Sequence, residues 1–94
     1  MSNIFSIKDK TGRTIRLTDE RWKHIAREHS QITNHEELKE TLENPVIIRK
    51  SKYDSKVAWY YRSNKKKKLY LMVSVKYLNG EGFIITAFYT RKIK

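Results

Sequence analysis

The sequence predicts an α+β fold in which an N-terminal β-hairpin and two helices pack on a four-stranded antiparallel sheet. The chain of 94 residues suits one domain, spanning residues 1–94, and is too short for two. Helical spacing is confined to the part before Pro45, and β-branched or alternating stretches follow it. Helices that precede a series of consecutive strands favour an antiparallel sheet packed against those helices.

The first expected element is a β-hairpin at the N-terminus. Residues 4–7 and residues 14–17 both alternate loosely between apolar and polar side chains. The stretch between them, Asp9-Lys10-Thr11-Gly12, contains residue types that favour a turn, with a glycine free to adopt a positive φ.

Two helices are expected next. The first begins after Thr18, a good N-cap, and runs to about His29 or Ser30. The second begins near Asn34 and ends at Asn44, because the residue before a proline avoids the α region. The residues that share one face of the first helix at i, i+3, i+4 and i+7 are Trp22, Ile25, Ala26 and His29.

Four strands are expected in the second half of the chain. Residues 46–48 and 57–62 are β-branched and aromatic, and residues 69–77 alternate strictly, which predicts one buried face. A hairpin turn at residues 79–82 leads to the last strand, at residues 83–89. Alternation along this strand places Thr86 on the same face as Ile84 and Phe88.

The charge of the chain indicates a polyanionic partner. Lys and Arg number 21 against 10 acids, for a formal net charge of +11. Beyond Pro45 the only acids are Asp54 and Glu81, so the second half is the expected polyanion face. A solubilising surface is the alternative, but such surfaces usually carry matching glutamates. The expected nucleic-acid contacts are Lys65, Lys66, Lys67 and Lys68, with Tyr60 as a candidate to stack on an unpaired base.

Several classes of site are not expected. The chain has no cysteine, hence no disulfide or thiolate metal site, and it lacks the HExxH spacing and any cluster of carboxylates. We therefore expect no metal and no cofactor. The N-terminus does not resemble a signal peptide, and no apolar stretch approaches the roughly 20 residues that span a bilayer, which favours a cytoplasmic protein without membrane contact.

The residues that metal-free RNA cleavage requires are all present. His24 and His29 could move protons, because histidine titrates near neutrality, but five positions on a helix point them to different sides. Arg62, Lys76 and Thr86 would form a cationic, hydroxyl-bearing surface if they share one sheet face. Alternation alone favours the simpler interpretation, in which Thr86 is an ordinary β-forming residue, the cations are solvated and His29 only ends its helix.

Nearly the whole chain resembles a known group of nucleases. The helix carries RWxHIxxxH at Arg21–His29, the second helix ends in ENP at residues 43–45, and WYYR occupies residues 59–62. VKYLNGEGFIITAFYT then spans residues 75–90. These motifs are similar to the phage-associated nuclease families of the barnase–EndoU–colicin–RelE (BECR) fold. A proline commonly follows the second histidine in such helices, and this chain has Ser30 there.

The resemblance implies a metal-independent endoribonuclease, often a toxin or a phage or mobile-element effector. When the site residues of such nucleases are carried over to this chain, His24 and His29 match the two histidines of the helix motif. Arg62 then matches the basic residue that ends WYYR, and Thr86 matches the hydroxyl-bearing residue of the last strand. Lys76 is added from strand geometry rather than from the resemblance. The alternatives are a non-catalytic RNA-binding module and a RelE-like toxin that cuts mRNA only on the ribosome. RNA is the expected partner, and an acidic antitoxin or immunity protein is a possible second one.

Overall fold

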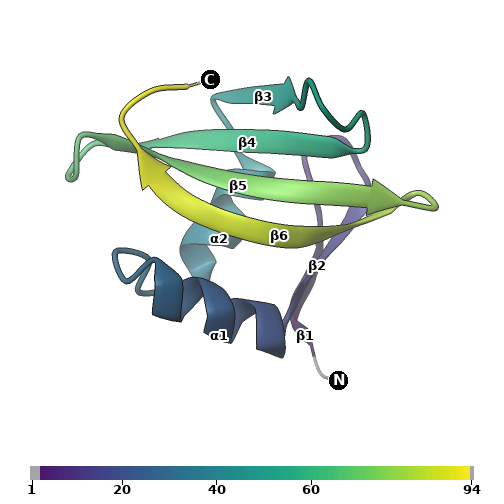
Figure 1. Ribbon diagram of the computed structural model, residues 1–94, viewed down its shortest axis with the longest axis horizontal. Helices are drawn as coiled ribbons and strands as arrows, with labels where there is room; N and C mark the ends of the chain where they lie inside the picture. Colours follow the sequence, from purple (N-terminus) through teal and green to yellow (C-terminus); the bar gives the residue numbers. More distant parts are fainter. Residues whose placement is uncertain (1–2, 94) are drawn as a thin grey trace.

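The computed structural model describes residues 3–93 and confirms the α+β class (Figure 1). Six strands form one mixed sheet, and both helices pack on one of its faces. In chain order the elements are β1 (Asn3–Lys8), β2 (Thr14–Thr18), α1 (Asp19–Glu28), α2 (Glu36–Glu43), β3 (Ile47–Lys50), β4 (Val57–Asn64), β5 (Leu69–Leu78) and β6 (Glu81–Thr90).

The sheet is larger than the sequence predicts. Its strand order is β1-β2-β6-β5-β4-β3, in which β3 to β6 form the expected antiparallel meander. The hairpin does not pack on a separate four-stranded sheet, so that prediction is wrong. Instead β2 pairs in parallel with the start of β6, where Ile15 lies opposite Gly82 and Arg16 opposite Phe83. This pairing satisfies backbone groups that an edge strand would leave open.

The helix boundaries follow local capping interactions, as predicted. The Thr18 hydroxyl oxygen accepts a hydrogen bond from the Arg21 backbone N–H at 3.2 Å, which caps α1. Helix α1 ends at His29, whose N–H donates to the Ile25 carbonyl at 2.8 Å. Ahead of α2, the Asn34 side-chain oxygen accepts from the Glu36 N–H at 2.9 Å. At the start of each helix, a side-chain oxygen therefore accepts a hydrogen bond from a backbone N–H that has no partner within the helix.

The core lies between the helices and one face of the sheet. Ile25 of α1 and Leu38 and Leu42 of α2 are fully buried against it. On β5 the buried residues of this face are Leu71, Val73, Val75 and Tyr77. We call the opposite side of the sheet, which faces away from both helices, the open face.

A β-bulge interrupts the pairing of β5 with β6. Ser74 lies opposite Thr86, but the next residue of β5, Val75, lies opposite Ile84, so β6 carries one extra residue. Ile84 and Ala87 are therefore both buried in the core, at 1% and 0% exposed. The expectation that Ile84 shares a face with Thr86 is wrong, because the bulge shifts the alternation. The bulge turns Thr86 to the open face, beside Ser74.

A buried carboxylate fastens the β1–β2 turn to the sheet. Asp9 accepts hydrogen bonds from the hydroxyls of Tyr60 and Tyr77 at 2.7 and 2.6 Å, and its other oxygen accepts from Thr11 and from the Arg13 N–H. Burial alone would raise the pKa of Asp9, but these hydrogen bonds outweigh it and hold that pKa below its usual value. Burial, together with the charge of Asp9, raises the pKa of Tyr60 to about 12 and that of Tyr77 as well.

Across residues 3–93, neither helix has the length and apolar character needed to cross a lipid bilayer.

Candidate functional site

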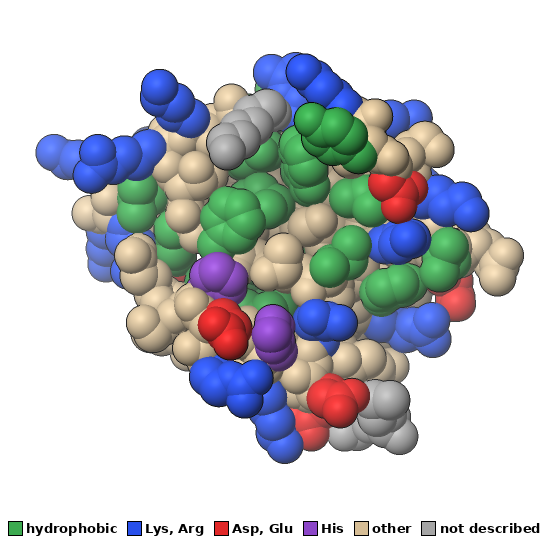
Figure 2. Space-filling view, in the orientation of Figure 1, with side chains coloured by type: hydrophobic (Ala, Val, Ile, Leu, Met, Phe, Trp, Pro, Cys, Tyr) green, Lys and Arg blue, Asp and Glu red, His purple; other side chains and the backbone are tan. Residues whose placement is uncertain are grey.

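The open face combines an apolar centre with a cationic margin. Figure 2 views this face and shows hydrophobic side chains near its middle, Lys and Arg around the edge, and histidine side chains between them. Strand pairing sets three rows of side chains across this face. The rows are Arg16, Phe83, Lys76 and Val57; then Thr86, Ser74 and Trp59; then Phe88, Met72 and Tyr61.

His29 lies at the rim of the open face. As the C-cap of α1, it leaves the helix axis, and its half-buried ring lies 5.8 Å from the Phe88 ring, centroid to centroid. The two side chains line a hollow of about 190 Å³ together with Glu28 and Gln31. The end of α1 therefore places the His29 imidazole next to β6, where the ring is only partly exposed to solvent.

His24 is exposed and lies further back along the same helix. It lines a second hollow with Thr18, Glu20 and Arg21. Helix α1 packs on β6 and runs in the same direction (Figure 1). His24 precedes His29 by five helical residues, or about 7.5 Å along the helix axis, and therefore lies nearer the start of β6.

Thr86 and Lys76 share the open face, as a common cationic, hydroxyl-bearing surface requires. Thr86 is half-buried beside Ser74, and Lys76 lies opposite Phe83 in the neighbouring row. The Lys76 ammonium is 3.2 Å from an Asp54 carboxylate oxygen. This partner holds the lysine in place at the margin of the face, with about a third of its side chain exposed.

Arg62 lies on the other side of the sheet. It is opposite Leu71, a core residue, and its guanidinium donates to the Asn44 carbonyl and to Glu40 of α2, both at 2.8 Å. The expectation that Arg62 shares a face with Lys76 and Thr86 is therefore wrong. Arg62 shares its side of β4 with Tyr60, and this side meets the helices.

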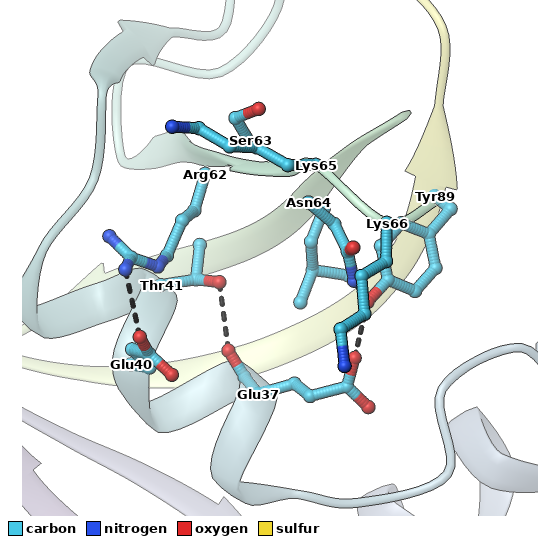
Figure 3. A pocket seen from close by; sticks show the side chains of 10 residues that line it. Glu37, Glu40, Thr41, Arg62, Ser63, Asn64, Lys65, Lys66 and Tyr89 are labelled. Carbon is cyan, nitrogen blue, oxygen red and sulfur yellow. Dashed lines mark hydrogen bonds and ion pairs between the residues drawn. The ribbon is translucent and has the colours of Figure 1, made fainter. Parts of the chain in front are cut away.

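A groove of about 280 Å³ surrounds Arg62 (Figure 3). At its base the Tyr89 hydroxyl donates to Glu37 and accepts from the Asn64 amide at 3.0 Å. Burial and the bond to Glu37 raise the pKa of Tyr89 to about 12. Lys65 and Lys66 line the rim of this groove. The Lys67 ammonium approaches the Tyr89 ring at 5.3 Å from its centroid.

Tyr60 is not available to stack on a base. It is 1% exposed, lies in the core and donates its hydroxyl to Asp9. Four aromatic residues of the open face are half-buried: Trp59, Tyr70, Phe83 and Phe88. Strict alternation along β6 would place Phe83 and Phe88 on opposite faces, and the bulge between them brings both to the open face.

The third histidine belongs to a different environment. The His35 ring packs edge-on against Trp22, with centroids 5.5 Å apart, and lies 6.4 Å from the Phe5 ring. These neighbours come from α1 and from β1, whereas Phe88 belongs to β6. His35 is therefore apart from the surface that His29 borders.

No set of three or more His, Asp or Glu side chains suited to hold a metal ion occurs among residues 3–93. Comparison with protein-family models, with curated proteins and with solved structures found no match.

Proposed function

We propose that this protein is a metal-independent endoribonuclease that cleaves RNA through attack of a ribose 2′-OH. The observation that carries the proposal is the contact of His29 with Phe88 beside the bulge that turns Thr86 to the open face. Bulges often re-aim side chains next to active sites. The resemblance of the α1 and β6 segments to BECR-fold nucleases points to the same residues.

His24 and His29 supply the two proton transfers. One imidazole removes the proton of the 2′-OH, whose oxygen then attacks the phosphorus, and the other protonates the departing 5′-oxygen. The products are a 2′,3′-cyclic phosphate and a free 5′-OH. Thr86 donates a hydrogen bond to the charged phosphorane, and Lys76 adds positive charge from the next row. Either histidine can take either role.

Arg62 is reassigned from the reacting phosphate to RNA binding. Its contacts with Glu40 and Asn44 face the helix side, away from Thr86. The exposed Lys65, Lys66, Lys67 and Lys68 extend from the same groove and would contact phosphates distant from the cleavage point. An acidic antitoxin or immunity protein could inhibit the enzyme by neutralising these cations.

A cleavage assay with purified protein tests the proposal. The protein is incubated with total RNA in EDTA, and fragments are analysed for cyclic phosphate ends. We expect wild type to produce them, and His24→Ala and His29→Ala to lose cleavage while keeping RNA binding. Binding without cleavage by wild type would favour the RNA-binding module instead. Cleavage seen only with ribosomes present would favour the RelE-like alternative.

A further inference from the structure

We propose that the substrate is unpaired RNA, held by base stacking on Phe83 and Phe88 on either side of Thr86. This inference deepens the proposed function and rests on it, because it names the form of RNA that the same face accepts. Neither the sequence motifs nor the proton-transfer chemistry gives a role to Phe83, Phe88 or Arg16, and stacking and phosphate binding supply one for each.

Phe83 lies between two cations. Across the sheet, Arg16 of β2 is its neighbour on one side and Lys76 of β5 on the other. Phe83 and Arg16 also line a hollow of about 440 Å³ at the edge of the face. An aromatic ring flanked by two cations can stack on a base while the cations contact the adjoining phosphates.

Both cations are available for such contacts. Arg16 is 3.5 Å from a Glu81 carboxylate oxygen, with 44% of its side chain exposed. The Lys76 pair with Asp54 is similarly exposed. Exposed pairs of this kind contribute little to stability, so a phosphate can compete for the cations at low cost.

Phe88 forms the second stacking position. It is half-buried on the open face, and its ring already contacts an aromatic ring of similar size, that of His29. Phe83 lies opposite Lys76 and Phe88 opposite Met72, four residues apart on β5 or about 13 Å. Thr86 lies between them, so an extended strand that stacks on both rings passes its backbone over Thr86.

A duplex cannot use this surface in the same way. Its bases are paired and stacked on one another, and only their edges are accessible in the grooves. Stacking on Phe83 or Phe88 requires a free base face. The arrangement therefore selects single strands, loops and ends, without a strong preference for base identity.

Binding to RNA that cannot be cleaved tests the inference independently of catalysis. The probes are a short 2′-O-methyl RNA strand and the duplex formed with its complement, titrated at one fixed salt concentration. The variants are Phe83→Leu, Phe88→Leu and Arg16→Gln. Lys10→Gln is the matched charge control, because Lys10 is exposed in the turn that contacts Leu42 on the helix side. Thermal unfolding of each variant shows that it is folded.

We expect wild type to prefer the single strand, and Phe83→Leu and Phe88→Leu each to weaken that binding about fivefold or more. Duplex binding should change little. Arg16→Gln should lower the salt slope for the single strand by about 0.7, and Lys10→Gln should not. Equal affinity of wild type for both probes, or folded phenylalanine variants with unchanged binding, would overturn the inference. A protein that shows this binding pattern but never cuts unmodified RNA would disprove only the nuclease.

Discussion

The ring of His29 lies 5.8 Å from the ring of Phe88, which joins the end of α1 to the open face of the sheet. The contact brings a titratable side chain to the strand that carries Thr86. Helix α1 and strand β6 run side by side in one direction, so His24 lies nearer the start of β6 than His29 does (Figure 1). At another place in the fold, the buried Asp9 holds the N-terminal hairpin to the sheet.

The hydroxyl of Thr86 should matter more than its shape. Thr86→Val keeps the volume but removes the donor to the phosphorane, so we expect kcat to fall about 100-fold or more. Thr86→Ser keeps the hydroxyl and should retain most of the activity. Steady-state rates on a short RNA measure both. If valine and serine at this position give equal rates, the hydroxyl has no part in the reaction.

Lys76 and Arg62 should have different kinetic signatures. Lys76→Gln removes a cation from the open face, and we expect kcat to fall about tenfold or more. Arg62→Gln removes a cation from the helix side, and should raise KM and reduce the salt slope by about 0.7. Kinetics at several salt concentrations separate the two effects. A larger loss of kcat for Arg62→Gln than for Lys76→Gln would contradict the assignment of the two faces.

Asp9 should stabilise the fold through its hydrogen bonds. Asp9→Asn replaces a charged acceptor of the hydroxyls of Tyr60 and Tyr77 with a neutral amide, and should lower the free energy of unfolding by about 2 kcal/mol. Urea unfolding at neutral pH measures the change. Asp19→Asn, at the half-buried first residue of α1, is the control and should cost about 0.3–1 kcal/mol. Similar losses for the two variants would show that Asp9 is not a structural anchor.

Stability should fall in alkaline solution through the same cluster. In the folded protein the pKa of Tyr60 is about 12, above the value near 10 of an unfolded chain. A raised pKa means that the neutral phenol is favoured by folding. The contribution of the neutral Tyr60 phenol to the free energy of unfolding is complete below pH 10 and is lost as the pH rises toward 12. Burial raises the pKa of Tyr77 in the same direction.

Tyr60→Phe tests this pH dependence, because it removes one of the two phenols. Between pH 10 and 12 its free energy of unfolding should decline less steeply than that of wild type, by up to about 1.4 kcal/mol per pH unit. Lysines that titrate in the same range are common to both proteins and cancel in the comparison. Parallel curves for the two proteins would mean that Tyr60 does not contribute.

Much of the local structure could be predicted from residue types. Thr18 caps α1 as expected, and Asn44 ends α2 before Pro45. The β5–β6 turn is tighter than expected, with only Asn79 and Gly80 at positive φ between the strands. These features depend on contacts within a few residues, so a single sequence contains the information.

The candidate site was only partly predictable. His29 facing the sheet follows from helical spacing, and Lys76 facing away from the core follows from alternation along β5. The face of Thr86 could not be derived, because a bulge adds one residue and reverses the alternation beyond it. Arg62 and Tyr60 were misplaced because alternation tells which residues share a side but not which side meets the helices.

The sequence by itself determined the α+β class, the order and approximate positions of the helices and strands and the excess of positive charge, since these follow from capping, periodicity and composition. Only the tertiary structure decided that β2 joins β6, that Thr86 faces outward and that Arg62 faces α2. The physical reason is that strand pairing and helix docking join residues distant in the chain. A shift of one residue in such a pairing exchanges the buried and exposed faces.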